Sequence, residues 1–147
     1  YGPRFRTEGI VTQEPPLVGS SFPAMVPAVN EDGNEVTGIL MPEQAVPLGT
    51  YTGWNLFNAA SGPSDMLATF TGSFIPFPRT KAERESTHDP RLSIEERYAS
   101  REEYLGKVAL AATQLIDEGY LMDVDLPAIV KEAGEHWDYL LDGPAFR

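Results

Sequence analysis

Proline is distributed unevenly along this chain. Ten of its thirteen prolines lie within residues 1–79, and only Pro90, Pro127 and Pro144 follow. Proline lacks a backbone N–H and breaks helix interiors, and within sheets it is confined to edges and bulges. We therefore expect an α+β chain with short strands, a hairpin and long loops in residues 1–79 and helices in residues 80–147. A length of 147 residues suits one structural unit.

The early part of the chain offers one hairpin signal. Two apolar stretches, residues 25–29 and 35–40, flank the polar run 30–34, which contains Asp32-Gly33. Asp-Gly between apolar stretches is typical of a hairpin turn, because glycine reaches positive φ without strain. Residues 1–24 hold too many prolines for a helix or a central strand, which leaves residues 9–12 as one short strand.

Residues 42–79 show no clear periodicity. They are rich in glycine, proline, threonine and aromatic residues. We expect a long, ordered and buried loop region here, with a short helix near residues 64–70 that Ser64 would cap.

The helical half carries clearer signals. Three capping boxes pair a Ser or Thr with a Glu three residues later, at 80/83, 93/96 and 100/103. The third opens a helix over about 101–118, which Gly119 would end. A last helix, capped by Asp125, would run to Gly143 and pack antiparallel to the first.

Composition excludes several classes of function. Twenty-two acidic residues against eleven basic ones give a net charge of −11, which repels nucleic acids and anionic membrane surfaces. No apolar run approaches the roughly 20 residues that cross a bilayer. The chain has no cysteine and only two distant histidines, so we expect no metal and no cofactor. The compartment stays unknown.

No catalytic set is visible in the sequence. A serine hydrolase on an α/β sheet needs a nucleophile elbow, usually Gly-x-Ser-x-Gly, and none of the eight serines lies in one. Ser64 has Gly62 before it but Met66 after it. His88 lies in a polar turn and His136 at the edge of an apolar helix face, so we interpret both as structural. A complete small enzyme built on either histidine is therefore disfavoured.

One aromatic segment, residues 46–57, has two interpretations. Its glycines, interleaved with Tyr51, Trp54 and Asn55, could bring backbone and rings close to a ligand. Alternatively, the aromatic rings fill the core beneath the helices, as large aromatic side chains commonly do. In the first interpretation these three residues form a substrate-binding pocket whose reactive groups come from elsewhere.

Several longer motifs occur in order along nearly the whole chain. They are GPRFRTEGIV (2–11), DGN (32–34), LMPEQAVPL (40–48), TYTGWNL (50–56), TGSFIPFPRT (71–80), DPRLSIEERY (89–98) and HWD (136–138). Through these motifs the chain resembles the C-terminal portion of a family of large bacterial alpha/beta hydrolase domain-containing proteins.

The resemblance implies a single C-terminal segment, residues 1–147, of a longer serine hydrolase that acts on esters or related acyl compounds. The family's nucleophile and catalytic histidine lie upstream of the matched portion, so no catalytic residue is carried over. The implied partners are the upstream hydrolase core of the same polypeptide and a small ester substrate, with the 50–55 loop covering the active site. A different class of function stays open: a non-catalytic binding module that uses the aromatic loop 50–57.

Overall fold

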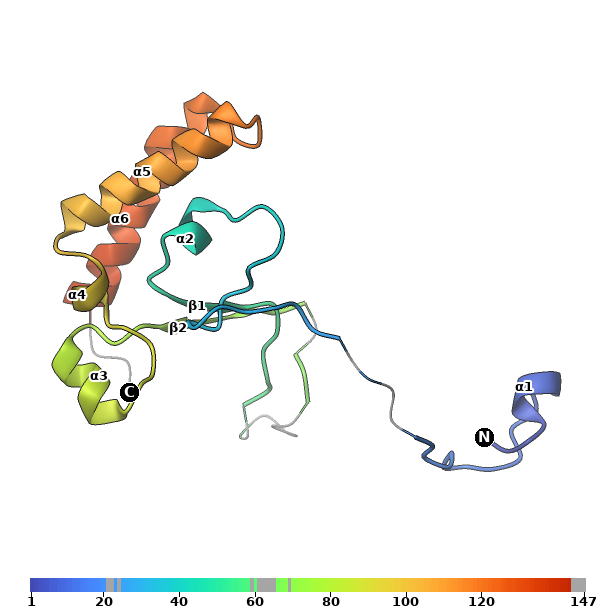
Figure 1. The fold of residues 1–147 in the computed structure, drawn as a ribbon. Helices are drawn as coiled ribbons and strands as arrows, with labels where there is room; N and C mark the ends of the chain where they lie inside the picture. The colour runs from blue at the N-terminus through green and yellow to red at the C-terminus, as the bar shows by residue number, and fades with distance from the viewer. Residues whose placement is uncertain (21–22, 24, 59, 61–65, 69, 144–147) are drawn as a thin grey trace.

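The computed structural model describes residues 1–20, 23, 25–58, 60, 66–68 and 70–143, and it shows an α+β chain (Figure 1). The elements in chain order are α1 (Phe5–Glu8), α2 (Pro42–Ala45), β1 (Gly49–Thr52), β2 (Ser73–Pro76), α3 (Lys81–Thr87), α4 (Ile94–Arg97), α5 (Arg101–Asp117), the 3-10 turn η2 (Asp123–Asp125) and α6 (Leu126–Asp142). Within the described residues, both strands precede residue 80 and every helix longer than four residues follows it. The expected division into two halves is confirmed.

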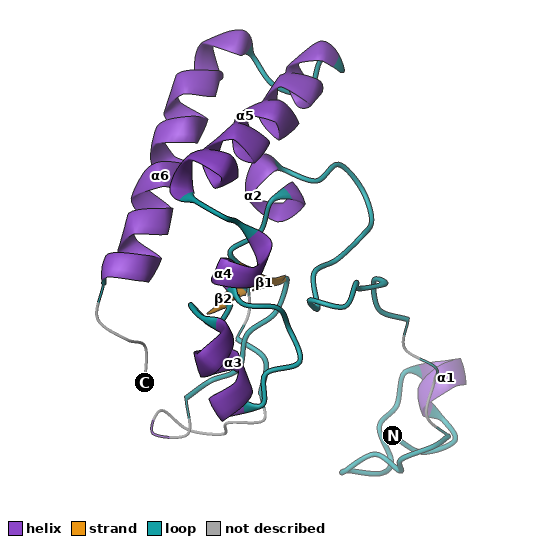
Figure 2. Cartoon of the chain, turned by 60° about the vertical axis from the view of Figure 1, so that its left-hand side comes forward, coloured by secondary structure: helices purple, strands orange, loops and turns teal. Residues whose placement is uncertain are grey.

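Helices α5 and α6 form the expected antiparallel pair and lie side by side in both views (Figures 1 and 2). Each helix turns one apolar stripe inward, at the three- and four-residue spacing of an amphipathic helix. The buried residues are Tyr104, Val108, Ala112 and Leu115 on α5 and Gly134, Trp137 and Leu140 on α6.

The C-terminus of α5 and the N-terminus of α6 are formed by different residues and hydrogen bonds. Gly119 takes φ +81°, and the N–H of Tyr120 donates to the carbonyl of Leu115 over 2.8 Å, so the expected glycine stop is confirmed. Asp125 is the N-cap residue of α6, as expected, but its side chain makes no capping hydrogen bond. The turn η2 leads directly into α6 instead, and Pro127 occupies the first helical turn.

An ion pair crosses the helix pair where α6 has a glycine. Arg101 Nε lies 2.7 Å from Asp138 Oδ1. A Cβ atom on Gly134 would lie 2.6 Å from Arg101 Nη2. Glycine in a helix interior costs about 1 kcal/mol relative to alanine, and here the missing side chain makes room for the guanidinium group.

All three expected caps form at the helix starts. Ser93 and Glu96 make the full reciprocal box. At Thr80 and Ser100 the hydroxyl accepts from the glutamate N–H three residues later, over 3.1 and 3.2 Å. Each of those glutamates reaches one residue further back than expected, to the N–H of Arg79 or Ala99. The backbone N–H of the residue before each N-cap is therefore also hydrogen-bonded.

The sheet lies where the sequence predicts only a loop. β1 and β2 pair antiparallel, with Thr50 opposite Ile75 and Tyr51 opposite Phe74. The strands have four residues each, too few for an alternating pattern to be visible. A Cβ atom on Gly49 would lie 2.6 Å from both the Ile75 carbonyl oxygen and the Phe74 ring. Glycine therefore allows the two strands to approach.

Of the predicted hairpin, the turn at residues 30–34 forms, but the two strands do not. Asn30 Oδ1 accepts from the N–H groups of Asp32 and Asn34, each over 3.0 Å, and Gly33 takes φ +78°. Beyond the turn only one bridge, Val29 to Glu35, is assigned. No strand is assigned to residues 25–29 or 35–40, the described residues on either side of this turn.

Two further expectations in the first half are wrong. Residues 9–12 form no strand. The preceding residues Phe5–Glu8 form a single helical turn, and Arg4 and Glu8 form an ion pair across it. Ser64 lies outside the described residues. The described part of the expected helix near 64–70 is not helical, because Leu67 pairs with Leu56 in an antiparallel bridge. The expected burial of residues 42–79 is found in part: Val46, Leu48 and Phe77 are buried, whereas the described residues around the bridge, such as Leu56, Leu67 and Phe70, are exposed.

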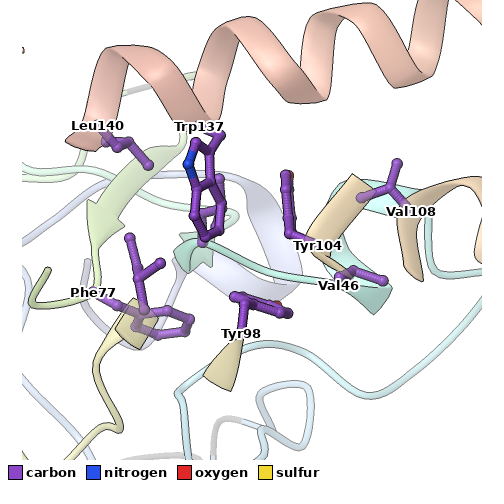
Figure 3. Packing of buried hydrophobic residues seen from close by; sticks show 9 residues of the cluster. Val46, Phe77, Tyr98, Tyr104, Val108, Trp137 and Leu140 are labelled. Atoms are coloured by element: carbon purple, nitrogen blue, oxygen red, sulfur yellow. The ribbon is translucent and has the colours of Figure 1, made fainter. Parts of the chain in front are cut away.

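The core lies between the sheet end, α4 and the helix pair (Figure 3). Its centre is aromatic: Tyr104 stacks on Trp137 at 5.1 Å between ring centroids, and Tyr98 meets Tyr104 edge-on at 5.2 Å. Such pairs contribute about 0.5–1.5 kcal/mol beyond the area that they bury. The buried cluster comprises Val46, Leu48, Phe77, Ile94, Tyr98, Tyr104, Val108, Trp137 and Leu140.

The buried side chain of Asn34 connects the turn at residues 30–34 to strand β1 through hydrogen bonds. Asn34 is 3% exposed, and its amide donates to the Gly49 carbonyl over 3.1 Å and accepts from the Tyr51 N–H over 2.7 Å. The Thr50 hydroxyl donates to the backbone carbonyl of Asp32. The side of β1 that faces away from β2 is therefore paired with the turn instead of with a third strand.

Two arginines in the segment before α5 form hydrogen bonds with the first half of the chain, Arg91 with the sheet and Arg97 with the turn. Arg91 donates to the carbonyls of Ile75 and Pro76 over 3.0 and 3.2 Å. Arg97 pairs with Asp32, with Nη1 and Oδ2 2.9 Å apart. Both guanidinium groups lie against the Phe77 ring, at 5.3 Å for Arg91 and 4.0 Å for Arg97.

We expect Asn34→Ala to lower the free energy of unfolding by about 2–4 kcal/mol, because it leaves a buried N–H and a buried carbonyl unpaired. Urea denaturation followed by circular dichroism measures the loss. The matched control is Asn58→Ala, at an exposed position, for which a change below about 0.5 kcal/mol is expected. Equal effects at the two positions would contradict the structural role of Asn34.

Acid stability should depend on Glu96. The Ser93 backbone N–H, the Ser93 hydroxyl and Arg84 lower the pKa of Glu96 from its ordinary 4.5 to about 2. This carboxylate therefore stabilises the fold above pH 4.5, and its contribution is lost as the pH falls toward about 2.

We expect Glu96→Gln to be less stable than the parent protein at neutral pH and to lose less stability on acidification through that window. Urea midpoints measured across the window test this expectation. Parallel pH profiles for the two proteins would contradict it. Glu85→Gln, on the exposed face of α3, is the matched control.

Candidate functional site

The structure separates the three residues that the sequence places in one pocket. Tyr51 is half-buried and lines a cavity, while Trp54 is 53% exposed and lines none of the cavities described here. Asn55 is structural: its amide donates to the Gly72 carbonyl over 3.2 Å and accepts from the Leu56 N–H over 2.8 Å. The strand β1 ends at Thr52, so Tyr51 lies within the strand and Trp54 beyond it.

The cavity beside Tyr51 has a volume of about 340 Å³. Ligand pockets in proteins span about 300–1,000 Å³, so this one suits a small molecule. Four elements build it, namely α2, β1, α5 and α6. The lining residues are Pro42, Glu43, Tyr51, Tyr104, Val108, Ile129, Glu132, Ala133 and His136.

Tyr104 contributes a hydroxyl group to this cavity. The residue is 1% exposed, and no described residue hydrogen-bonds to its hydroxyl. Every fully buried side-chain nitrogen or oxygen among the described residues has a partner. The small exposed part of Tyr104 therefore includes the hydroxyl, and Tyr104 is one of the residues that line the cavity. Burial, and then the charge of Glu43, raises its pKa to about 12.

Tyr51 and His136 also bring polar groups without partners. No described residue hydrogen-bonds to the Tyr51 hydroxyl or to either ring nitrogen of His136. Both rings pack against Phe74 in tilted arrangements, with ring centroids 5.0 Å apart for Tyr51 and 4.9 Å apart for His136. Burial raises the pKa of Tyr51 and lowers the pKa of His136 below its ordinary 6.5. Both side chains are therefore neutral at pH 7.

The charges around the cavity have one sign. Glu43 and Glu132 line it, and no lysine or arginine does. Both glutamates are exposed, and no ion pair to either is found among the described residues. Glu43 is close enough to Tyr51 and Tyr104 for its charge to raise the pKa of each phenol.

The cavity lacks the parts of a hydrolytic site. No serine lines it, and within the described chain no serine hydrogen-bonds to a histidine. His88 lies elsewhere, in the left-handed conformation that ends α3. No group of three or more His, Asp or Glu side chains able to hold a metal ion is found among the described residues. The arrangement can bind a small molecule but offers no positioned nucleophile.

Sequence reasoning missed most of this site. From the sequence we place His136 at the edge of an apolar helix face. Tyr104, Glu43 and Glu132 are not among the residues predicted to form a site. One signal was available: Glu132 and His136 are four residues apart on α6 and so share a face. The closeness of Tyr51 to Tyr104 depends on how β1 meets α5, which no local pattern reveals.

A comparison with known proteins identifies the class of the chain. The sequence model of a family described as an alpha/beta hydrolase domain matches residues 3–131. The chain therefore belongs to this alpha/beta hydrolase family, as its motifs indicate. No curated protein and no solved structure matches it.

Membership of this family does not locate a catalytic serine in the chain. The nucleophile of an α/β hydrolase lies on a sharp turn between a strand and a helix of the central sheet. The part of the chain that the structure describes has one sheet, of two antiparallel strands. In that same part, no helix is long and apolar enough to cross a membrane.

The two tryptophans provide a test of these assignments. Trp54→Ala should change the free energy of unfolding by less than about 0.5 kcal/mol, because the side chain is largely in solvent. Trp137, 8% exposed and stacked in the core, should lose about 3–5 kcal/mol on the same change. If Trp137→Ala does not fold, Trp137→Phe gives a smaller loss in the same direction. A large loss at Trp54 would place that residue in the core and contradict its assignment here.

Proposed function

We propose that this chain is a non-catalytic C-terminal segment of a serine hydrolase that acts on esters or related acyl compounds. In this proposal the nucleophile comes from an upstream hydrolase core of the same polypeptide, and the segment covers part of the active site. Membership of the alpha/beta hydrolase family supports the class of reaction. The lack of a nucleophile elbow in the sequence supports the non-catalytic role.

One observation carries the docking part of the proposal. The apolar hairpin, which we define as residues 54–57, 66–68 and 70, exposes six large apolar side chains and includes no charged residue. Soluble monomers rarely expose apolar patches of this kind, and such patches commonly mark interaction surfaces. The exposed side chains are Trp54, Leu56, Phe57, Met66, Leu67 and Phe70.

Phe70 gives the strongest indication within this hairpin. Its side chain is fully exposed, and its backbone takes φ +59°, a conformation that costs a bulky residue energy. Nothing within the described chain compensates for either feature. Packing of this ring against a hydrolase core would compensate for both.

The segment that leads to the sheet has the same character. Leu17, Val18, Met25 and Val26 are each about four-fifths exposed or more. Figure 1 shows this part of the chain extending from the sheet toward α1. Prolines within it prevent pairing into a sheet of its own, so we propose that it docks on the core as an arm.

A second candidate function is a binding module that does not depend on a hydrolase core. The observation that favours it is the cavity, in which Tyr51 lies beside two further polar groups that lack partners. Of the aromatic loop 50–57, Tyr51 is the residue that this candidate would use.

A fluorophosphonate probe, which labels activated serines, tests the first candidate. We expect no labelling of the 147-residue chain, and labelling of the longer native protein at a serine outside these residues. Labelling of any serine within the chain, abolished by prior heating, would contradict the proposal.

Variants of the apolar hairpin test docking in the longer protein. We expect the double change Phe57→Ser with Leu67→Ser to lower kcat/KM for a p-nitrophenyl ester by about tenfold, through loss of packing on the core. Leu110→Ser is the matched control, because Leu110 is an exposed leucine on α5. Equal activity of the two variants would show that the hairpin does not dock at the active site.

A further inference from the structure

The cavity beside Tyr51 brings together aromatic rings, hydrogen-bond acceptors and negative charge. From this combination we propose that the cavity binds a small organic cation, an ammonium group that carries compact apolar substituents. The proposal rests on this chain's own residues, so it holds whether or not the chain docks on a hydrolase core.

Charge is the first argument. The two ionised groups that line the cavity, Glu43 and Glu132, are both negative. The two lysines of α5 and α6 are engaged elsewhere, Lys107 with Glu103 at 2.8 Å and Lys131 with Glu135 at 3.1 Å. A cavity with walls of one sign attracts the opposite ion, and the net charge of −11 reinforces that attraction.

The rings are the second argument. Tyr51 and His136 bring two half-buried aromatic rings from two elements to one small cavity, whereas the Tyr104 ring stacks on Trp137 and contributes its hydroxyl. The face of an aromatic ring attracts a cation within about 6 Å of its centroid, and aromatic cages are a common way to recognise quaternary ammonium groups. Because burial lowers the pKa of His136, its ring adds no positive charge that would oppose this ligand at pH 7.

The hydroxyl of Tyr104 is the third argument. It belongs to a cavity-lining residue that is 1% exposed, and it has no hydrogen-bond partner among the described residues. We infer that it faces the cavity. A polar group so deeply enclosed normally has a hydrogen-bond partner. Its oxygen can accept a hydrogen bond from an ammonium N–H, or lie against the polarised methyl groups of a quaternary ammonium ion.

The remaining walls set the size and the character of the ligand. Pro42, Val108, Ile129 and Ala133 provide an apolar surface within a volume of about 340 Å³. An anion is disfavoured by both glutamates, and a purely apolar molecule would leave the polar groups of Tyr51, Tyr104 and His136 unpaired. A compact ammonium ion places its positive charge between the two glutamates and its apolar substituents against the apolar walls, and it can contact the phenol oxygens of Tyr51 and Tyr104.

Three molecules of the same shape test the proposal: choline, its neutral carbon isostere 3,3-dimethyl-1-butanol, and the anion 3,3-dimethylbutanoate. Binding is measured on the intact chain by NMR of the histidine ring protons. His88, exposed at the end of α3, is the internal reference. We expect choline to shift the His136 signals saturably without moving those of His88. The neutral isostere should bind at least about tenfold more weakly, and the anion should not bind.

Charge variants locate the effect. Glu43→Gln combined with Glu132→Gln should weaken choline binding by about fivefold or more, since it removes both charges that line the cavity. Both side chains are exposed, so the fold should be unchanged. Glu85→Gln, which removes one charge from the exposed surface of α3, should leave choline binding as it is.

Tyr104→Phe provides a second test that keeps the ring in the core and removes only the hydroxyl. We expect weaker choline binding with an unchanged circular dichroism spectrum. The proposal is overturned if choline binds no better than its neutral isostere, if shifts at His88 match those at His136, or if no saturable binding occurs.

Discussion

The contact of two guanidinium groups with one phenylalanine ring holds the two halves of this chain together. Phe77 follows β2, and Arg91 and Arg97 lie against its ring from the segment before α5. Through their hydrogen bonds these arginines reach the carbonyls at the end of the sheet and the carboxylate of Asp32 in the turn. A two-stranded sheet is marginal by itself. Here it is supported by ion pairs that are nearly enclosed, Arg91 with Asp89 and Arg97 with Asp32. Leu48 and Phe77, which flank the two strands, also join the buried apolar cluster.

The same arrangement explains the polar residues of the motif at 89–98. Asp89 pairs with Arg91, Ser93 and Glu96 cap α4, and the Tyr98 hydroxyl donates to the Pro47 carbonyl over 2.8 Å. These contacts position the start of α5, and α5 in turn presents Tyr104 to the cavity. The motif at 89–98 is therefore a scaffold, whereas the motifs at 40–48, 50–56 and 136–138 contribute Glu43, Tyr51 and His136 to the cavity.

The sequence predicts the helical half well and the first half poorly, for a physical reason. Caps, the Gly119 stop and the apolar faces of α5 and α6 are local features, and each is visible within a few residues. The pairing of β1 with β2 joins Gly49 to Pro76 across a sequence in which no periodicity marks either strand. The turn at 30–34 is predicted correctly. The backbone groups on the free edge of β1 are hydrogen-bonded to the Asn34 side chain, however, and not to a third strand. The site follows the same rule: Tyr51 is predicted from its own segment, whereas its neighbours Tyr104 and His136 are brought there by packing.

The exposed apolar hairpin also gives the chain two opposed tendencies in solution. A net charge of −11 keeps copies apart over a range of about 8 Å at physiological ionic strength. The apolar surface of the hairpin attracts other copies only at contact. Salt screens the repulsion and leaves the attraction in place. The colloidal stability of this chain should therefore fall as the salt concentration rises, so that low ionic strength keeps it monomeric.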